Sequence, residues 1–224
     1  MITATGLNSI ITLSYGFATN TFFIEAEITL ITPSTDVVGE VATLIGEGYG
    51  ANEEVRIDFG THKTITTTIA SGNGTFSTTF IISTQEWGTR VVTAQGNASQ
   101  NLDTTIFLIE SKIISIDRPE GYVSEPLTIK GTGYKADKVL TIHFGTKQSI
   151  TTTQVNSNGT FSTTFIINAQ PHNTKVITVV PQSPARINTT IFIIRTDIKS
   201  INPSSGPPSA LDVPTIITLQ GDGF

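Results

Sequence analysis

One ten-residue sequence, NGTFSTTFII, lies at residues 73–82 and returns unchanged at residues 158–167, 85 positions later. The same offset relates three shorter matches, which are Gly46–Tyr49 with Gly131–Tyr134, Phe59–Thr61 with Phe144–Thr146, and Thr104–Phe107 with Thr189–Phe192. Aligned without a gap, residues 28–112 and 113–197 are identical at 36 of 85 positions. One offset kept over this length indicates a tandem duplication.

The repeat continues into both ends of the sequence. Phe22 aligns with Phe107 at the same offset, so the first residues resemble the last two strands of a preceding copy. The last residues open a further copy, which carries a five-residue insertion. We therefore expect a segment of a longer repeat array, made of the end of one copy, two whole copies and the start of another: residues 1–27, 28–112, 113–197 and 198–224.

The composition favours strands over helices. The chain contains 39 Thr and 31 Ile, about a third of its 224 residues, and both residue types are β-branched. In the first copy we predict seven strands, at residues 28–32, 41–45, 55–59, 64–70, 75–82, 89–94 and 104–109. Asn73-Gly74 predicts a type I′ turn that closes a hairpin between the fourth and fifth of these strands.

The spacing of the strands predicts the fold class. Turn signals recur every 8–12 residues, and a unit of about 85 residues suits an immunoglobulin-like sandwich. We predict an all-β protein of tandem immunoglobulin-like β-sandwich domains arranged as beads on a string. A β-solenoid is the alternative, but solenoid rungs repeat every 20–30 residues, which is far shorter than the period observed here.

Charge and residue types exclude several functions. With 13 basic and 18 acidic residues the net charge is −5, so we expect no nucleic-acid partner. The absence of Cys excludes disulfides, thiolate metal sites and cysteine nucleophiles. No apolar run reaches the length of about 18 residues that a transmembrane helix needs, so we expect no membrane span in this part. The first residues lack the features of a signal peptide.

Three motifs, read in order, resemble a known family. They are an opening Ile-x-Pro-x-x-Gly turn at 201–206, a Gly-x-Gly-[Tyr/Phe] bend at 46–49, 131–134 and 221–224, and Asn-Gly-Thr-Phe-Ser-Thr-Thr-Phe at 73–80 and 158–165. Together they resemble the IPT/TIG-type immunoglobulin-like repeats of large prokaryotic cell-surface proteins. The resemblance implies an extracellular location and a place in surface-layer proteins, adhesins or the stalks of surface enzymes.

The Gly-x-Gly-Tyr motif is not predicted to bind phosphate. It lacks a following helix and a Lys, which phosphate loops use. We interpret its glycines as a tight bend and Tyr49 as the cap of the sandwich. The three histidines, His62, His143 and His172, align with other residue types in the neighbouring copy, so we predict surface histidines rather than a metal site.

Acidic residues gather in the first copy, at Glu47, Glu53, Glu54 and Asp58. The second copy replaces them with Thr132, Lys138, Val139 and His143, which favours a solvated acidic face over a repeated ion site. We therefore predict no cofactor. Because surface-layer arrays use calcium, the resemblance leaves Ca²⁺ at the repeat interfaces open as an alternative.

Four Asn-x-Ser/Thr sequences are candidate N-glycosylation acceptors: Asn73, Asn97, Asn158 and Asn188. No arrangement of catalytic residues stands out, so we predict that the chain is not an enzyme. The leading hypothesis is a structural segment of a secreted, self-assembling cell-surface protein, an S-layer-like lattice or fibre whose partners are copies of itself. The alternatives are an adhesin or stalk that binds cell-envelope glycans, and a spacer for a surface enzyme encoded elsewhere in the chain.

Overall fold

The computed structural model describes residues 11–15, 18–22, 24–182, 186–205 and 216–224. The secondary structure of these residues consists of strands. The described residues form two compact units. The first unit holds those up to Lys112 together with residues 132–136 and 157–160, and the second holds the others from Ile113 onward.

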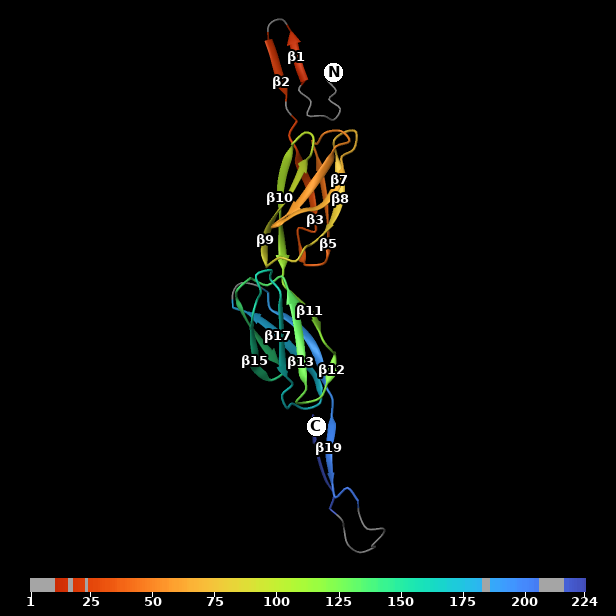
Figure 1. Ribbon diagram of the computed structural model, residues 1–224, viewed down its shortest axis with the longest axis vertical. Helices are drawn as coiled ribbons and strands as arrows, with labels where there is room; N and C mark the ends of the chain where they lie inside the picture. Colours follow the sequence, from red (N-terminus) through yellow and green to blue (C-terminus); the bar gives the residue numbers. More distant parts are fainter. Residues whose placement is uncertain (1–10, 16–17, 23, 183–185, 206–215) are drawn as a thin grey trace. The chain divides into compact units, whose positions relative to one another are not determined.

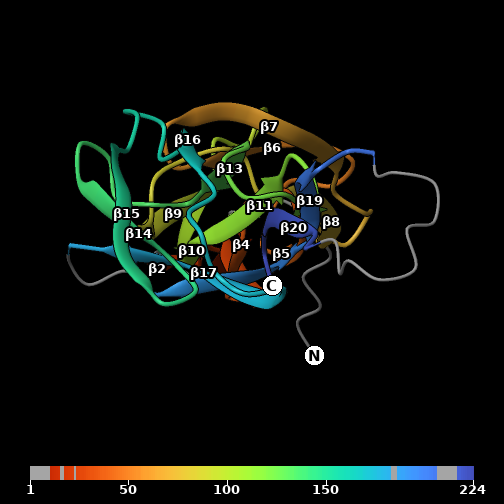
Figure 2. The same ribbon diagram turned by 90° about the horizontal axis from the view of Figure 1, so that it is seen from below.

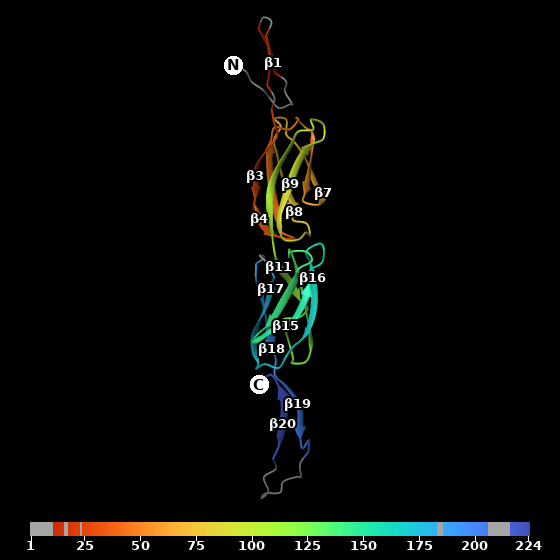
Figure 3. The ribbon, with the colours of Figure 1, turned by 90° about the vertical axis from the view of Figure 1, so that its left-hand side faces the viewer.

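The first repeat folds as a sandwich of two sheets. Its strands are β3 (Glu27–Thr32), β4 (Thr35–Val37), β5 (Val41–Glu47), β6 (Glu54–Phe59), β7 (His62–Ile69), β8 (Phe76–Ile81), β9 (Gly88–Gly96) and β10 (Leu102–Glu110). One sheet has the order β3-β5-β8 and the other the order β4-β10-β9-β6-β7 (Figures 1 and 3). The predicted all-β, immunoglobulin-like sandwich is thus confirmed. All seven predicted strands are present, and the structure contains one further strand, β4, that the sequence did not predict.

The second repeat reproduces this topology. Its strands are β11 (Lys112–Ile116), β12 (Glu120–Gly121), β13 (Pro126–Thr132), β14 (Val139–Phe144), β15 (Lys147–Gln154), β16 (Phe161–Ile166), β17 (Asn173–Pro181) and β18 (Asn188–Ile194). The sheets have the orders β11-β13-β16 and β12-β18-β17-β14-β15, and β14 runs beside β15 in Figure 2. Each strand therefore occupies the place of its counterpart 85 residues earlier.

Two strand pairs flank the repeats. β1 (Ile11–Tyr15) pairs antiparallel with β2 (Ala18–Phe22), and residues 1–10 lie outside the described part. β19 (Asp197–Asn202) pairs with β20 (Thr218–Asp222), Ile198 opposite Gly221, with a bulge before Ser200. In the first repeat β3 and β5 pair in the same way, with the same position of the bulge.

Period-2 alternation builds the core of each sandwich. In β5 the side chains of Ala42 and Leu44 are fully buried. Val41, the first residue of this strand, is exposed. The centre of the first core is the Phe59 ring, whose centroid lies 5.4 Å from that of Phe80 and 5.7 Å from that of Phe107. Phe144, Phe165 and Phe192 repeat this cluster in the second copy, with centroid separations of 5.4 and 5.9 Å. The contacts of Phe59 with Phe80 and of Phe144 with Phe165 join the two sheets of each sandwich across the core.

The turn at Ser71–Gly74 does not close a hairpin, so that prediction is wrong. β7 pairs with β6, and β8 pairs with β5 in the other sheet. Gly74 has a φ of +80°, but Asn73 is not among the residues with positive φ, which excludes a type I′ turn. The Gly74 N–H donates to the Ser71 carbonyl (2.9 Å), so the central residues of the turn are Gly72 and Asn73.

Candidate functional site

The two repeated glycine motifs meet at one end of the sandwich. The Tyr49 N–H donates to the Gly74 carbonyl (3.1 Å), and the Tyr49 ring packs edge-on against Phe76. Tyr49 is 1% exposed, and burial raises the pKa of its hydroxyl. The second copy repeats the contact, from the Tyr134 N–H to the Gly159 carbonyl (3.0 Å). The bend therefore has the structural role that the sequence predicts.

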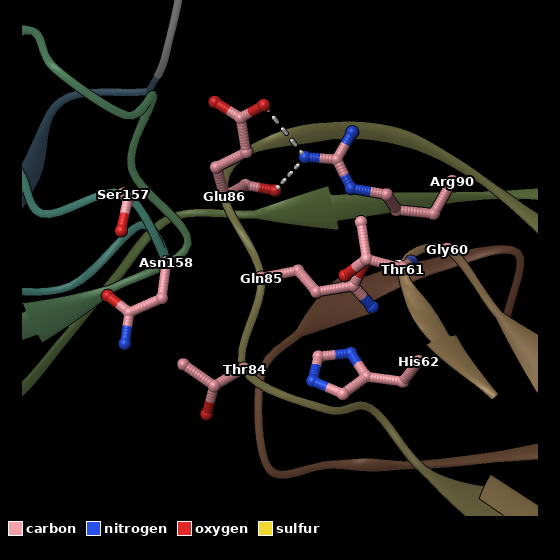
Figure 4. A pocket seen from close by; sticks show the side chains of 9 residues that line it. All are labelled: Gly60, Thr61, His62, Thr84, Gln85, Glu86, Arg90, Ser157 and Asn158. Atoms are coloured by element: carbon pink, nitrogen blue, oxygen red, sulfur yellow. Dashed lines mark hydrogen bonds and ion pairs between the residues drawn. The ribbon is translucent and has the colours of Figure 1, made fainter.

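A buried glutamine holds the hairpin between β6 and β7. Gln85 is 4% exposed, and its Oε1 accepts hydrogen bonds from the Thr61 N–H (3.0 Å) and hydroxyl (3.3 Å). Its Nε2 donates to the Phe59 carbonyl (3.2 Å) and to Ser83 Oγ (3.1 Å). Gly60, with a φ of +57°, leaves room for this amide, because a Cβ there would lie 2.1 Å from Oε1. Figure 4 shows the amide beside Thr61.

Gln170 repeats this arrangement in the second copy. Its Oε1 accepts from the Thr146 N–H (3.0 Å), and its Nε2 donates to the Phe144 carbonyl (3.0 Å) and to Asn168 Oδ1 (2.9 Å). Sequence reasoning missed both glutamines. The available signal was their identity at the 85-residue offset, in a loop where neighbouring positions differ. In both copies the Phe-Gly-Thr motif therefore binds the side-chain amide of a buried glutamine.

The surface around Gln85 forms a pocket (Figure 4), to which Gly60, His62 and Arg90 also contribute. The Arg90 guanidinium lies 3.3 Å from the Glu86 carboxylate and donates to the Glu86 carbonyl (2.8 Å). The contacts between Arg90 and Glu86 stabilise the loop between β8 and β9.

The predicted solvated acidic face is wrong for Glu53, which is 7% exposed. Its carboxylate accepts hydrogen bonds from the N–H groups of Gly50 (2.5 Å), Ala98 (2.9 Å) and Ser99 (2.8 Å) and from the Ser99 hydroxyl (2.6 Å). Burial raises the pKa of this carboxyl, but these hydrogen bonds outweigh burial and hold the pKa below its ordinary value. Glu53 thus joins two loops that are far apart in the sequence.

Asp58 is also buried, at 4% exposure. It accepts a hydrogen bond from the Thr64 N–H (2.8 Å) and lies 3.1 Å from Lys63 Nζ and 3.3 Å from Arg56 Nε. Burial by itself would raise the pKa of Asp58. The hydrogen bonds and the two neighbouring cations outweigh burial and hold this pKa below its ordinary value. The reason for the burial is the same as for Glu53: backbone donors from a turn replace the water that the carboxylate loses.

His143 takes the place of Asp58 in the second copy. Its Nδ1 accepts a hydrogen bond from the Ser149 N–H (3.0 Å), the counterpart of the Thr64 N–H. The imidazole therefore performs the carboxylate's structural task with its unprotonated nitrogen. The substitution explains why an acidic position of the first copy could become a histidine without loss of the turn.

The acidic residues do not converge on an ion. Glu47 is exposed, and Glu54, also exposed, accepts a hydrogen bond from Asn97 Nδ2 (2.5 Å). Within the described ranges, no group of three His, Cys, Asp or Glu side chains is arranged to hold a metal. Calcium at a repeat interface stays the alternative to the prediction of no cofactor.

The histidines bind different groups. His62 Nδ1 lies 3.2 Å from Ser83 Oγ, and His172 Nδ1 lies 2.7 Å from the Ile194 carbonyl. Hydrolytic triads contain a Ser–His contact of this kind. In the second copy, however, Asn168 replaces Ser83 and Lys147 replaces His62. The contact is therefore particular to the first copy.

The structure places three of the four predicted glycan acceptors, Asn73, Asn97 and Asn158, on the exposed surface, and Asn188 half-buried at the start of β18. Asn73 and Asn158 occupy the same turn of the two copies, where their Oδ1 atoms accept from the Thr75 (3.1 Å) and Thr160 (2.7 Å) hydroxyls. Glycosylation at these positions stays a prediction.

The sequence profile of the macroglobulin-like domain family matches residues 24–109. That range coincides with the strands β3 to β10, and so with the first immunoglobulin-like sandwich. No curated protein matches the chain. In the described part of the chain, no helix has the length and apolar character of a membrane span.

Several solved structures resemble the chain. The BSP domain of a biofilm-associated protein is 14% identical, with a TM-score of 0.26, over 71% of this chain and 28% of that one. The E. coli alpha-2-macroglobulin is 9% identical, with a TM-score of 0.33, over 76% of this chain and 17% of that one. The Yersinia pseudotuberculosis adhesin InvE is 9% identical, with a TM-score of 0.35, over 75% and 58%. The chain thus spans less than two thirds of each.

Proposed function

We propose that this chain is a structural, non-catalytic segment of a secreted, self-assembling cell-surface protein built from tandem immunoglobulin-like domains. The repeats are of the IPT/TIG type, and the assembly is an S-layer-like lattice or a surface fibre. Its principal partner is a second copy of the same protein, at the cell surface.

The observation that supports this proposal is the duplication of a whole sandwich. Both copies have the same sheet orders, and both use a buried glutamine against a Phe-Gly-Thr turn. Copying a complete sandwich gives a chain equivalent surfaces at regular sequence intervals. Equivalent surfaces are what a lattice or fibre needs, since each contact can be repeated along the assembly.

The polar residues of the first repeat support a structural role as well. Gln85, Glu53 and Asp58 each bind backbone N–H or C=O groups of loops, and so stabilise the sandwich. Their hydrogen-bonding capacity is directed at the protein itself. These residues are therefore explained by the fold without a substrate.

Two measurements test the proposal. Sedimentation velocity of the purified chain, from about 1 to several hundred µM, should show association that increases with concentration. Fractionation of the native host, followed with an antibody against this chain, should place the full protein in the cell envelope. A chain that is monomeric at every concentration, with the full protein absent from the envelope, would contradict the proposal.

A further inference from the structure

The outer face of the five-stranded sheet carries exposed aliphatic side chains. Val91 of β9 and Ile106 of β10 are direct cross-strand partners, and they are 50% and 64% exposed. Leu102, two strand positions further along the same face of β10, is 52% exposed. Together with Thr104, which lies between Leu102 and Ile106 on this face, these side chains form the first patch.

The second repeat carries the same patch at the same positions. Val176 of β17 and Ile191 of β18 are cross-strand partners, 47% and 62% exposed, and Ile187 is 57% exposed. Packing of the core favours apolar residues at buried positions, but folding places no such restriction on exposed ones. On the same face, Arg56 has become Thr141 and Glu110 has become Arg195. The aliphatic positions stayed aliphatic while charged neighbours on this face changed, as expected of a surface that binds a partner, although Ile81 on the other sheet also recurs as Ile166.

The chemistry of the face favours another β-sheet as its partner. Thr93 pairs with Thr104 between Ile106 and Leu102, and Thr178 pairs with Thr189 between Ile191 and Ile187. Short, neutral, β-branched side chains allow two sheets to approach to about 10 Å, the distance at which sheets pack face to face. A second copy of this chain offers such a face.

The net charges of the two repeats favour one pairing of the patches over the others. Residues 28–112 contain nine acidic and four basic side chains, a net charge of −5. Residues 113–197 contain five acidic and eight basic side chains, a net charge of +3. Two first repeats would repel each other, and so would two second repeats, whereas a first repeat attracts a second.

From these observations we infer that the Val91–Ile106 face of one chain binds the Val176–Ile191 face of another. This interface deepens the proposed function, because it rests on the self-association proposed above and names its surface. The aliphatic patches supply the area removed from water, and the opposite net charges select the pairing.

The absence of Cys from the chain permits a direct test by disulfide trapping. One full chain carries Thr104→Cys, a second carries Thr189→Cys and a mass tag, and both positions are exposed. When the two are mixed and oxidised, the 104–189 dimer should exceed either homodimer at least tenfold. Its yield should fall in about 1 M NaCl, where screening reaches about 3 Å. Thr79→Cys and Thr164→Cys, exposed on the three-stranded sheets, are the matched control pair.

A second variant separates surface from fold. Ile106→Lys should weaken association measured by sedimentation at least tenfold, because it places a cation against the basic second repeat. Ile81→Lys, on the other sheet and 65% exposed, should leave association unchanged. Both variants should keep the wild-type melting temperature, since the substituted side chains are exposed.

The outcomes distinguish the two proposals. A predominance of 104–104 or 189–189 dimers, or trapping only through the control pair, would overturn this interface while self-association stands. The same holds if Ile81→Lys weakens association and Ile106→Lys does not. A wild-type chain that stays monomeric and forms none of these dimers would overturn both the interface and the self-association on which it rests.

Discussion

Gln85 and Gln170 each satisfy backbone groups that the fold would otherwise bury without partners. Each amide accepts from a turn N–H and donates to the carbonyl of a core phenylalanine. A buried polar group that loses its partner costs about 1–3 kcal/mol. Their identity at the 85-residue offset marks these glutamines, but their role does not follow from the sequence, because the value of an amide depends on which backbone groups the turn leaves unpaired.

The first prediction concerns Gln170. Gln170→Leu should lower the free energy of unfolding by about 1–3 kcal/mol, because the Thr146 N–H and Phe144 carbonyl lose their partner. Urea unfolding followed by circular dichroism measures the loss. Gln148→Leu, at an exposed position of the same repeat, is the control and should change the midpoint little. Equal midpoints for the two variants would contradict the role assigned to Gln170.

The second prediction concerns Glu53. Glu53→Gln should destabilise the first repeat by about 1.5–3 kcal/mol at pH 7, because a neutral amide cannot accept from all four donors. The folded pKa of Glu53 is lowered, so its stabilisation is complete above the unfolded value of about 4.3 and is lost as the pH falls through the folded pKa.

The difference in the free energy of unfolding between wild type and Glu53→Gln should therefore become smaller below about pH 4.3, as measured by urea unfolding at several pH values. Glu47→Gln, at an exposed position, is the control and should show no such narrowing. A difference that is constant between pH 7 and pH 3 would refute the assignment of this stabilisation to the ionised carboxylate.

At the scale of elements, periodicity predicted the seven long strands but not β4 or the path of the chain after β7. β4 has three residues, too few for any alternation, and it exists because it pairs with the distant β10. The Asn-Gly signal describes only the local turn. Which sheet the following strand joins depends on long-range pairing, and β8 joins β5 because Phe76 and Phe80 are needed in the core.

The third prediction concerns the turn that leads into β8. Gly74→Ala should lower the free energy of unfolding by more than about 1 kcal/mol, because the site has a φ of +80° and a Cβ there would lie 2.4 Å from the Tyr49 carbonyl oxygen. Gly72→Ala is the matched control in the same turn, since its Cβ would meet no atom within 4 Å. If thermal melts show the two variants to be equally stable, this account of the turn is wrong.

At the scale of the molecule, the duplication and the fold class followed from the sequence because strand period and repeat offset are properties of the chain alone. The burial of Glu53 and Asp58 did not follow. Their partners include Ser99 and a turn N–H, and only the folded chain brings these together. In the second copy Lys138 replaces Glu53, so this copy lacks the carboxylate that joins the two loops of the first copy.

The fourth prediction is that the two repeats differ in acid sensitivity. Glu53 and Asp58 have lowered pKa values, so protonating them removes stability from the first repeat, whereas Lys138 and His143 replace them in the second. On acidification below about pH 4, the first repeat should unfold at the higher pH. Trp87, the only Trp, reports on the first repeat by fluorescence, and hydrogen exchange measured by mass spectrometry reports on peptides of the second. Coincident transitions would count against this asymmetry.

The parallel pairing of β4 with β10 has a mechanical consequence. β4 lies near the point where the chain enters the first repeat and β10 near the point where it leaves, and the Leu108 N–H donates to the Ser34 carbonyl (3.0 Å) beside this pair. A force that pulls on both ends would load these bonds in shear, together rather than one after another. β12 and β18 repeat the arrangement. Each repeat should therefore resist a force that is applied through its two chain ends.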